Sequence, residues 1–220
     1  MLKDKYQLNK EDSIFLAKRL LVDSIWKTAN LEGIAVTFPD TQVIFDGMTV
    51  NGYRVDELIA INNIKKSWFF IIDNIDYDID FEYICHVNKI VGGEGNVYKA
   101  GQLRNFDVAI GGTSWKPEKP VKEEIESQLF EILSEKSTTE RAIDIMLYIM
   151  RKQMFCDGNK RTAQICANQV MISGGAGIIS IPIEHQSHFT KLLVEYYESA
   201  ENATIKQFVF DNCIFGMDKY

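Results

Sequence analysis

Apolar residues recur at helical spacing along most of this 220-residue chain, and this periodicity restricts the fold more than any other feature. In the first such segment, Ile14, Leu21 and Ile25 fall on one face of a helix. Asp80 and either Thr138 or Thr139 are suited to cap later helices. The predicted helices cover residues 12–30, 54–74, 80–92, 121–135, 138–154, 159–172, 184–199 and 204–215.

Residues 93–116 are the exception, because this glycine-rich stretch shows short alternating segments instead of the helical pattern. Two short strands joined by a turn fit it best. The sequence contains no internal repeat and no low-complexity linker. It therefore predicts a mostly α fold with one small β-hairpin, in a single domain of residues 1–220.

The overall charge limits the partners of the chain. Asp and Glu outnumber Lys and Arg by 31 to 24, which gives a net charge of -7. Nucleic acid is therefore excluded as a partner, since broad electrostatic attraction to phosphate needs a basic surface. The sequence has no run of about 18 apolar residues that could cross a membrane, and its polar start, MLKDKYQLNKED, lacks a signal-peptide core. We expect a cytoplasmic protein.

The stretch Asp157-Gly158-Asn159-Lys160-Arg161, called the phosphate turn below, lies between two predicted helices. Unpaired amides at the start of a helix attract anions, and glycine lets the backbone approach them closely. Two cations at that end are unfavourable without an anion, and arginine can hold two phosphate oxygens. Asp157 is a hard oxygen ligand suited to Mg²⁺. Taken alone, the stretch is also compatible with an ordinary connection between helices.

The longer stretch from Gln153 to Arg161 resembles the signature of the Fic/Doc family, His-x-Phe-x-Asp/Glu-x-Asn-Gly/Lys-Arg. Five of the six comparable positions match, and Gln153 stands at the position of the histidine. Residues 101–115, called the flap segment below, resemble the hairpin flap that clamps a target protein by strand addition. The flap residues carried over are Gly101, Leu103, Arg104, Gly112, Thr113 and Trp115.

A third feature lies near the N-terminus. Thr28-Ala29-Asn30-Leu31-Glu32-Gly33 is similar to the Ser/Thr-x-x-x-Glu-Gly/Asn motif on the inhibitory helix of many Fic proteins. In those proteins the glutamate competes with the γ-phosphate of the nucleotide for an arginine. An ordinary helix end with a glycine cap is the alternative reading of Glu32-Gly33.

The resemblance implies a Fic-like helical bundle with a small β-hairpin flap. It implies an inhibitory-type N-terminal helix at 10–33, a core at 55–200 and a C-terminal helix at 201–220. The implied activity is the transfer of AMP from ATP to a protein hydroxyl. Asp157 would hold Mg²⁺, and the motif histidine would take up the hydroxyl proton. The implied nucleotide-binding residues are Phe155, Gly158, Asn159, Lys160 and Arg161.

The sequence departs from the family pattern at three positions that bear on the reaction. Gln153 cannot act as a general base, because its amide takes up no proton near neutral pH. Lys160 replaces the glycine usual in AMP-transferring members and is similar to Doc, which phosphorylates its target. Gln164 replaces a second arginine that pairs with the inhibitory glutamate. Glu32 then either reaches Arg161 or no longer inhibits.

We therefore expect weak or absent AMP transfer, and two other functions stay open. One is a non-catalytic, antitoxin-like regulator that binds a partner through the flap segment. The other is a Doc-like protein phosphotransferase, which Lys160 suggests. The sequence leaves both the target protein and homo-oligomer formation open.

Overall fold

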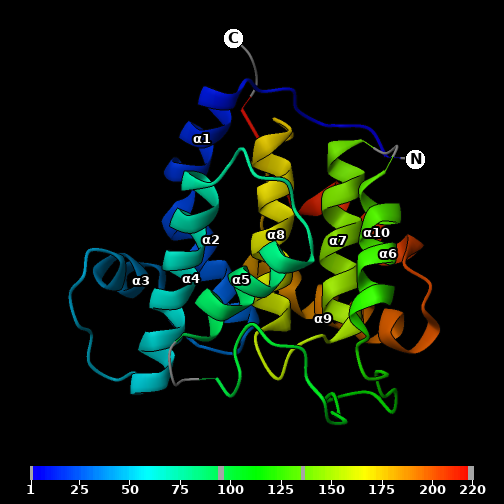
Figure 1. Ribbon diagram of the computed structural model, residues 1–220. Helices are drawn as coiled ribbons and strands as arrows, with labels where there is room; N and C mark the ends of the chain where they lie inside the picture. The colour runs from blue at the N-terminus through cyan, green and yellow to red at the C-terminus, as the bar shows by residue number, and fades with distance from the viewer. Residues whose placement is uncertain (1, 94–96, 135–136, 218–220) are drawn as a thin grey trace.

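The computed structural model describes residues 2–93, 97–134 and 137–217, and helices dominate these ranges (Figure 1). The helices in them are α1 (Lys10–Arg19), α2 (Leu21–Leu31), α3 (Phe38–Phe45), α4 (Val55–Asp73), α5 (Phe81–Gly92), α6 (Lys122–Leu133), α7 (Thr138–Lys152), α8 (Asn159–Ser173), α9 (Ile183–Ser199) and α10 (Ala203–Asn212). Strands β1 (Ile178–Ile179) and β2 (Ile214–Phe215) pair in antiparallel register.

Helices α7 and α8 lie side by side at the centre of the molecule (Figure 1). Ser137 caps α7, because its side chain accepts a hydrogen bond from the backbone N–H of Glu140. Helix α7 ends at Lys152 with Gln153 as its C-cap, and α8 begins after Gly158. The short connection between the two helices therefore places the phosphate turn at one end of the central pair.

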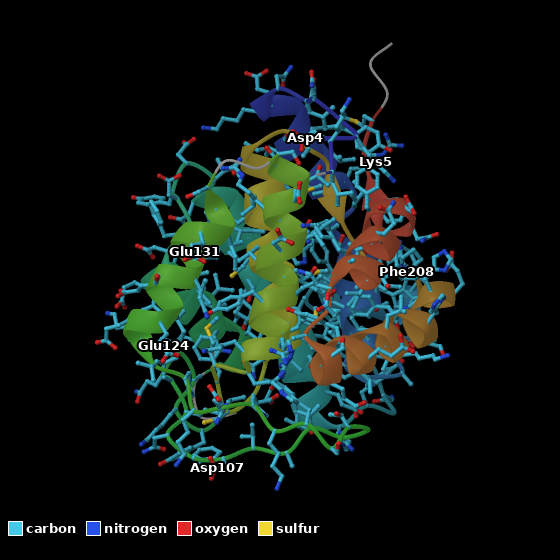
Figure 2. All side chains as sticks on the ribbon, turned by 90° about the vertical axis from the view of Figure 1, so that its right-hand side faces the viewer. Asp4, Lys5, Asp107, Glu124, Glu131 and Phe208 are labelled. Carbon is cyan, nitrogen blue, oxygen red and sulfur yellow. The ribbon has the colours of Figure 1, made fainter. Side chains whose placement is uncertain are left out.

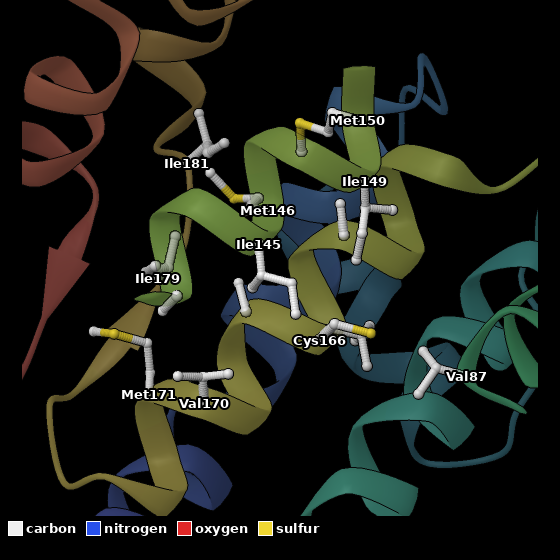
Figure 3. Packing of buried hydrophobic residues seen from close by; sticks show 14 of the residues in the cluster. Val87, Ile145, Met146, Ile149, Met150, Cys166, Val170, Met171, Ile179 and Ile181 are labelled. Carbon is white, nitrogen blue, oxygen red and sulfur yellow. The ribbon is translucent and has the colours of Figure 1, made fainter. Parts of the chain in front are cut away.

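The facing sides of α7 and α8 form the centre of the hydrophobic core. Figure 3 shows Met146, Ile149 and Met150 of α7 beside Cys166 and Met171 of α8, and all five are fully buried. Each fully buried apolar side chain of this size contributes roughly 1.5–3 kcal/mol. Because this packing involves the two helices on either side of the phosphate turn, it fixes their relative position.

The helices agree with the periodicity of the sequence, with three differences. Helix α3 was not predicted, and the single helix expected at residues 12–30 is divided into α1 and α2 at Leu20. The predicted N-cap at Thr138 or Thr139 is wrong by one residue, since Ser137 is the cap. The mostly helical class with a small antiparallel element is confirmed.

The position of the strands differs from the prediction. Residues 93 and 97–116, the described part of the stretch expected to form a hairpin, contain no strand. The small sheet instead joins β1 to β2, and β2 occupies the last residues of a predicted helix. The expected C-terminal helix is therefore α10, which ends at Asn212 and is followed by a strand.

The loop that contains the flap segment runs beneath the ends of α7 and α8, where it is drawn in green in Figure 1. Asp107 lies at its outer edge, and Glu124 lies on α6 nearby (Figure 2). In the described ranges, no helix combines the length and the apolar character needed to cross a membrane. The extent of the domain, 1–220, stays a prediction.

Candidate nucleotide site

The connection between α7 and α8 begins and ends in left-handed backbone. Gln153 has a φ of 49° and Gly158 a φ of 77°. A Cβ atom at position 158 would lie 2.9 Å from Cγ1 of Val91 and 3.3 Å from Nδ2 of Asn88. Glycine is therefore required there both for its backbone conformation and for the close approach of α5.

The side chain of Asn159 holds the turn in shape. Its Oδ1 accepts a hydrogen bond from the backbone N–H of Phe155 at 3.0 Å, and its Nδ2 donates to the Phe155 carbonyl at 2.9 Å. Asn159 is 6% exposed and Phe155 is 1% exposed. Both residues were predicted to bind nucleotide. In this structure both are buried, and their hydrogen bonds to each other stabilise the turn.

The first amides of α8 point to an anion site. Within the described residues, the backbone N–H groups of Asn159, Lys160 and Arg161 donate to no protein acceptor, and no side chain caps the helix. Free amides and the positive end of a helix dipole both favour a bound anion. The turn therefore fits a phosphate group.

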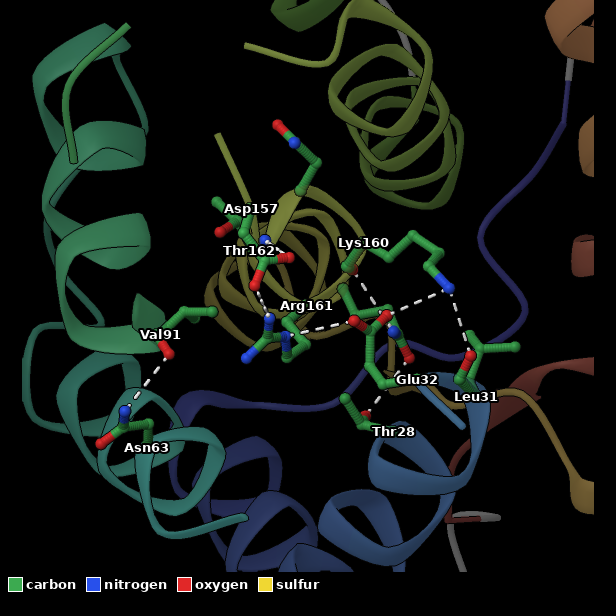
Figure 4. Close-up of polar contacts among 12 residues, drawn as sticks. Thr28, Leu31, Glu32, Asn63, Val91, Asp157, Lys160, Arg161 and Thr162 are labelled. Carbon is green, nitrogen blue, oxygen red and sulfur yellow. Dashed lines mark hydrogen bonds and ion pairs between the residues drawn. The ribbon is translucent and has the colours of Figure 1, made fainter. Parts of the chain in front are cut away.

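Glu32 contributes a negative charge to this site (Figure 4). Its Oε2 lies 3.2 Å from Nε of Arg161, and its Oε1 lies 3.4 Å from Nζ of Lys160. The side chains of Glu32 and Arg161 are 13% and 7% exposed. Lys160 also donates to the carbonyl of Leu31 at 3.2 Å. The end of α2 is thus held to the start of α8 by both cations of the phosphate turn, and the pairing of Glu32 with Arg161 considered from the sequence is present.

The other two residues of the N-terminal motif lie at the same contact. Thr28 donates a hydrogen bond from Oγ1 to Oε1 of Gln164 at 3.2 Å, and Gln164 donates to the carbonyl of Lys160 at 3.3 Å. Gly33 follows Glu32 with a φ of 82°. Gln164, which stands where a second arginine was expected, therefore binds Thr28. Glu32 pairs with Lys160 and Arg161 instead.

Asp157 lies at the open side of the turn, with a side chain that is 60% exposed. Its Oδ1 accepts from the backbone N–H of Gly158 at 2.6 Å, and its Oδ2 lies 3.1 Å from Nη2 of Arg161. The described residues contain no group of three or more His, Cys, Asp or Glu side chains that could hold a metal ion. Asp157 therefore fits Mg²⁺ only together with phosphate oxygens, which is the usual arrangement for this ion.

The side chain of Gln153 is turned toward the protein. Its Nε2 donates to the carbonyl of Met150 at 2.6 Å, and its Oε1 accepts from Nδ2 of Asn159 at 3.2 Å. Both ends of the amide are therefore occupied within the protein.

Arg104 was expected to contact a target, but it is only 2% exposed. Its guanidinium donates to the carbonyls of Gln153 at 2.6 Å, Phe106 at 2.7 Å, Pro117 at 3.3 Å and Glu118 at 2.6 Å. Burial lowers the pKa of Arg104, although a guanidinium stays charged at neutral pH. Arg104 thus fastens the base of the loop to Gln153, the C-cap residue of α7.

Asn88 is a residue of this site that sequence reasoning missed. It is fully buried on α5, and its Nδ2 donates to the carbonyl of Asp157 at 3.0 Å and to Oγ1 of Thr162 at 3.1 Å. Its Oδ1 accepts from the backbone N–H of Gly101 at 2.8 Å. An asparagine among the apolar residues of a helix was the available signal, because a buried amide requires hydrogen-bond partners.

The remaining flap residues pack against α9. Trp115 stacks on Tyr197 with ring centroids 5.6 Å apart, and Thr113 donates from Oγ1 to Glu198 at 2.9 Å. Leu103 is partly buried against the core, and Gly112 has a φ of 84°. Within the described residues, the backbone N–H groups between positions 105 and 112 donate to no protein acceptor. The middle of the flap segment is therefore open to a partner.

Replacing Arg104 by alanine is expected to lower the free energy of unfolding by about 3 kcal/mol, because several buried carbonyls lose a charged donor. Chemical denaturation measures this change. Arg54→Ala is the control, since that side chain is 73% exposed, and its effect should stay within about 0.5 kcal/mol. Equal stability of the Arg104 and Arg54 variants would show that the loop is not fastened in this way.

The helical fold is similar to that of solved Fic proteins. A Fic domain-containing signaling protein from Bacteroides thetaiotaomicron superposes with a TM-score of 0.73 at 18% identity, covering 92% of this chain and 84% of that one. The BepC protein of Bartonella tribocorum, solved with bound AMPPNP, superposes with a TM-score of 0.50 at 13% identity, covering 71% and 85%. These two likenesses concern the fold alone.

Residues 78–171 match the model of the Fic/DOC family, so the chain contains a Fic/DOC family domain. The protein adenylyltransferase fic-1 of Caenorhabditis briggsae is 23% identical over 191 residues, which is 82% of this chain and 36% of the relative. The chain thus spans little more than a third of the length of that curated relative.

Proposed function

We propose that this domain binds ATP and Mg²⁺ at the phosphate turn and transfers AMP to a protein hydroxyl, slowly and under inhibition by Glu32. The observation that carries the proposal is the Glu32 carboxylate between Lys160 and Arg161. A carboxylate held by two cations at a helix start occupies the place that the charges of a phosphate would take.

The geometry of the Glu32 contact suits reversible inhibition. Oε1 of Glu32 and Nε of Arg161 are buried and form no aligned hydrogen bond, although each lies near an opposite charge. Such a contact is weaker than a well-aligned pair, because the desolvation cost is only partly repaid. A phosphate group that brings more charge and more acceptor oxygens can therefore displace Glu32.

Asp157 is the residue that would hold Mg²⁺ together with phosphate oxygens. The bound ion would neutralise charge that develops on the phosphates during transfer. The free amides of Asn159 and Lys160 would orient one phosphate, and Arg161 would bind it once Glu32 has left. These residues position the nucleotide, while none of them accepts the proton of the attacking hydroxyl.

The target is expected to be a protein, bound along the middle of the flap segment. The free backbone groups between positions 105 and 112 can pair with an extended segment of a partner, although they form no strand without one. The name of the C. briggsae relative, a protein adenylyltransferase, supports AMP as the transferred group.

A non-catalytic regulator that binds a partner through the flap segment is the second candidate. The inward orientation of Gln153 favours it, because each end of that amide already forms a hydrogen bond within the protein. Lys160, the residue that suggested phosphotransfer, has a role in the contact with Glu32 and Leu31.

Titration of ATP with Mg²⁺ into the protein by calorimetry tests the proposal. The Glu32→Gly variant should bind about 10-fold more tightly than wild type, a gain of roughly 1.4 kcal/mol, because Arg161 and Lys160 are released. Asp46→Gly is the matched control, since Asp46 is also a carboxylate at a helix C-cap but lies on α3. Absence of binding by wild type and by Glu32→Gly would reject the nucleotide site and leave the regulator.

A further inference from the structure

A groove of about 570 Å³ lies at the end of the α7–α8 pair opposite the phosphate turn. The loop before α5 and the start of α5 form one wall, and the end of α6 forms the other. The first turn of α7 and the last turns of α8 close the groove. Its lining residues include Tyr77, Phe81, Leu129, Phe130, Arg141 and Gln169. None of them takes part in the nucleotide site, so the groove calls for a separate explanation.

Apolar side chains form much of this groove. Phe81, Leu129 and Val170 are buried in its floor, whereas Tyr77 and Phe130 are 66% and 76% exposed at its edges. Large rings exposed to water beside an apolar floor mark a surface that interacts with another molecule. An occupant that covered both rings would remove a large apolar area from water.

Carboxylates surround the apolar floor. Asp78, Asp80, Glu82 and Glu126 all line the groove, while Arg141 is the one cation in its described lining. Lys122, outside the lining, lies 2.7 Å from Glu82 and 3.8 Å from Glu126 and offsets part of this charge. Within the described residues, Asp78 is not part of an ion pair. The groove therefore attracts cations and repels phosphate-bearing ligands such as nucleic acid or anionic lipid.

Gln169 gives the groove a fixed shape. This residue is 1% exposed, and its Nε2 donates to the carbonyls of Asn74, Ile75 and Tyr77. The loop wall is therefore held in place before anything binds. Within the described residues, Oε1 of Gln169 is buried without a hydrogen-bond donor, and such a group is rare in a folded protein.

We propose that this groove docks a segment of a partner protein in which an apolar side chain is flanked by lysine or arginine. The apolar side chain would lie between Phe130 and Tyr77, and the flanking cations would face Asp78 and Asp80. Charge complementarity favours a basic partner over a second copy of this chain, whose net charge is -7.

Selection from a phage-displayed library of random 12-residue peptides on the immobilised full chain tests this proposal. The enriched peptides should carry an apolar residue next to lysine or arginine. Their affinity, measured by fluorescence anisotropy, should fall at least 10-fold on the Phe130→Ser/Asp78→Lys double variant. Both positions are exposed, so this variant should keep the wild-type unfolding temperature.

Phe15→Ser is the control, because Phe15 is an exposed aromatic residue on α1, outside both the groove and the flap segment. It should leave peptide affinity unchanged. Enrichment of acidic peptides, equal affinity for the double variant, or no enrichment at all would overturn the proposal. Sedimentation equilibrium should show that the wild-type chain is a monomer. A wild-type dimer that the double variant no longer forms would overturn the docking proposal and indicate self-association through the groove. No step of this test involves nucleotide, so its result is independent of the proposed transfer activity.

Discussion

Replacing Gln153 by histidine in the Glu32→Gly variant is expected to raise AMP transfer by roughly 10²–10⁴-fold, the usual gain from general acid–base assistance. Histidine takes up a proton near neutral pH, whereas the glutamine amide does not. Position 153 is the C-cap of α7, in the connection that leads to the phosphate turn, and Arg104 and Asn159 hold it there. The transfer is measured with ATP labelled at the α position.

Two controls separate the role of position 153 from a general effect of histidine. Glu32→Gly alone shows the rate without a base, and Glu32→Gly with Gln102→His places a histidine on the exposed part of the flap segment instead. No labelled protein from any variant would reject the transferase and favour the regulator. Label that comes only from the γ position of ATP would identify a Doc-like phosphotransferase.

The second large effect is expected at Arg161. In the Glu32→Gly background, Arg161→Ala should weaken ATP binding about 100-fold, because a charged hydrogen bond to phosphate contributes roughly 1.5–3 kcal/mol. The Glu32→Gly background avoids a confounding effect, since Arg161→Ala alone would remove one of the two cations that pair with the Glu32 carboxylate within the described residues. Calorimetry with ATP and Mg²⁺ measures the loss.

Arg19→Ala in the same background is the matched control, because Arg19 is an exposed arginine at the end of α1. It should bind ATP as the Glu32→Gly variant does. If the Arg161 and Arg19 variants bind equally, the nucleotide does not bind at the phosphate turn. A measurable loss that stays below about 10-fold would mean that the free amides of α8 hold most of the phosphate and that the guanidinium contributes little.

The long helices could be predicted from the sequence because their signals are local. Helices α4 and α5 show a continuous apolar stripe, and Asp80 caps α5 as expected. Helix α3 was missed, since eight residues are too few for a clear period. The strands were misplaced because β1 and β2 have two residues each and pair across a long stretch of chain, which no local pattern indicates.

Part of the candidate site could likewise be predicted from the sequence, and part could not. The phosphate turn is one continuous motif, so its glycine and cations could be recognised before the structure was known. The contact of Glu32 with Arg161 was one of two alternatives, because chain distance alone could not choose between them. Asn88 and the inward role of Arg104 escaped prediction, since their partners are backbone groups and side chains far along the chain.

Arg104 also has a consequence for how such a domain can change in evolution. Its guanidinium binds the carbonyl of Phe106 at one end of the loop and those of Pro117 and Glu118 at the other. The ends of the loop are therefore fixed independently of what lies between them. Each doubling of a flexible loop costs only about 0.6 kcal/mol in closure entropy. Residues between Phe106 and Pro117 can thus be inserted, deleted or exchanged to recognise a different target while the phosphate turn keeps its geometry.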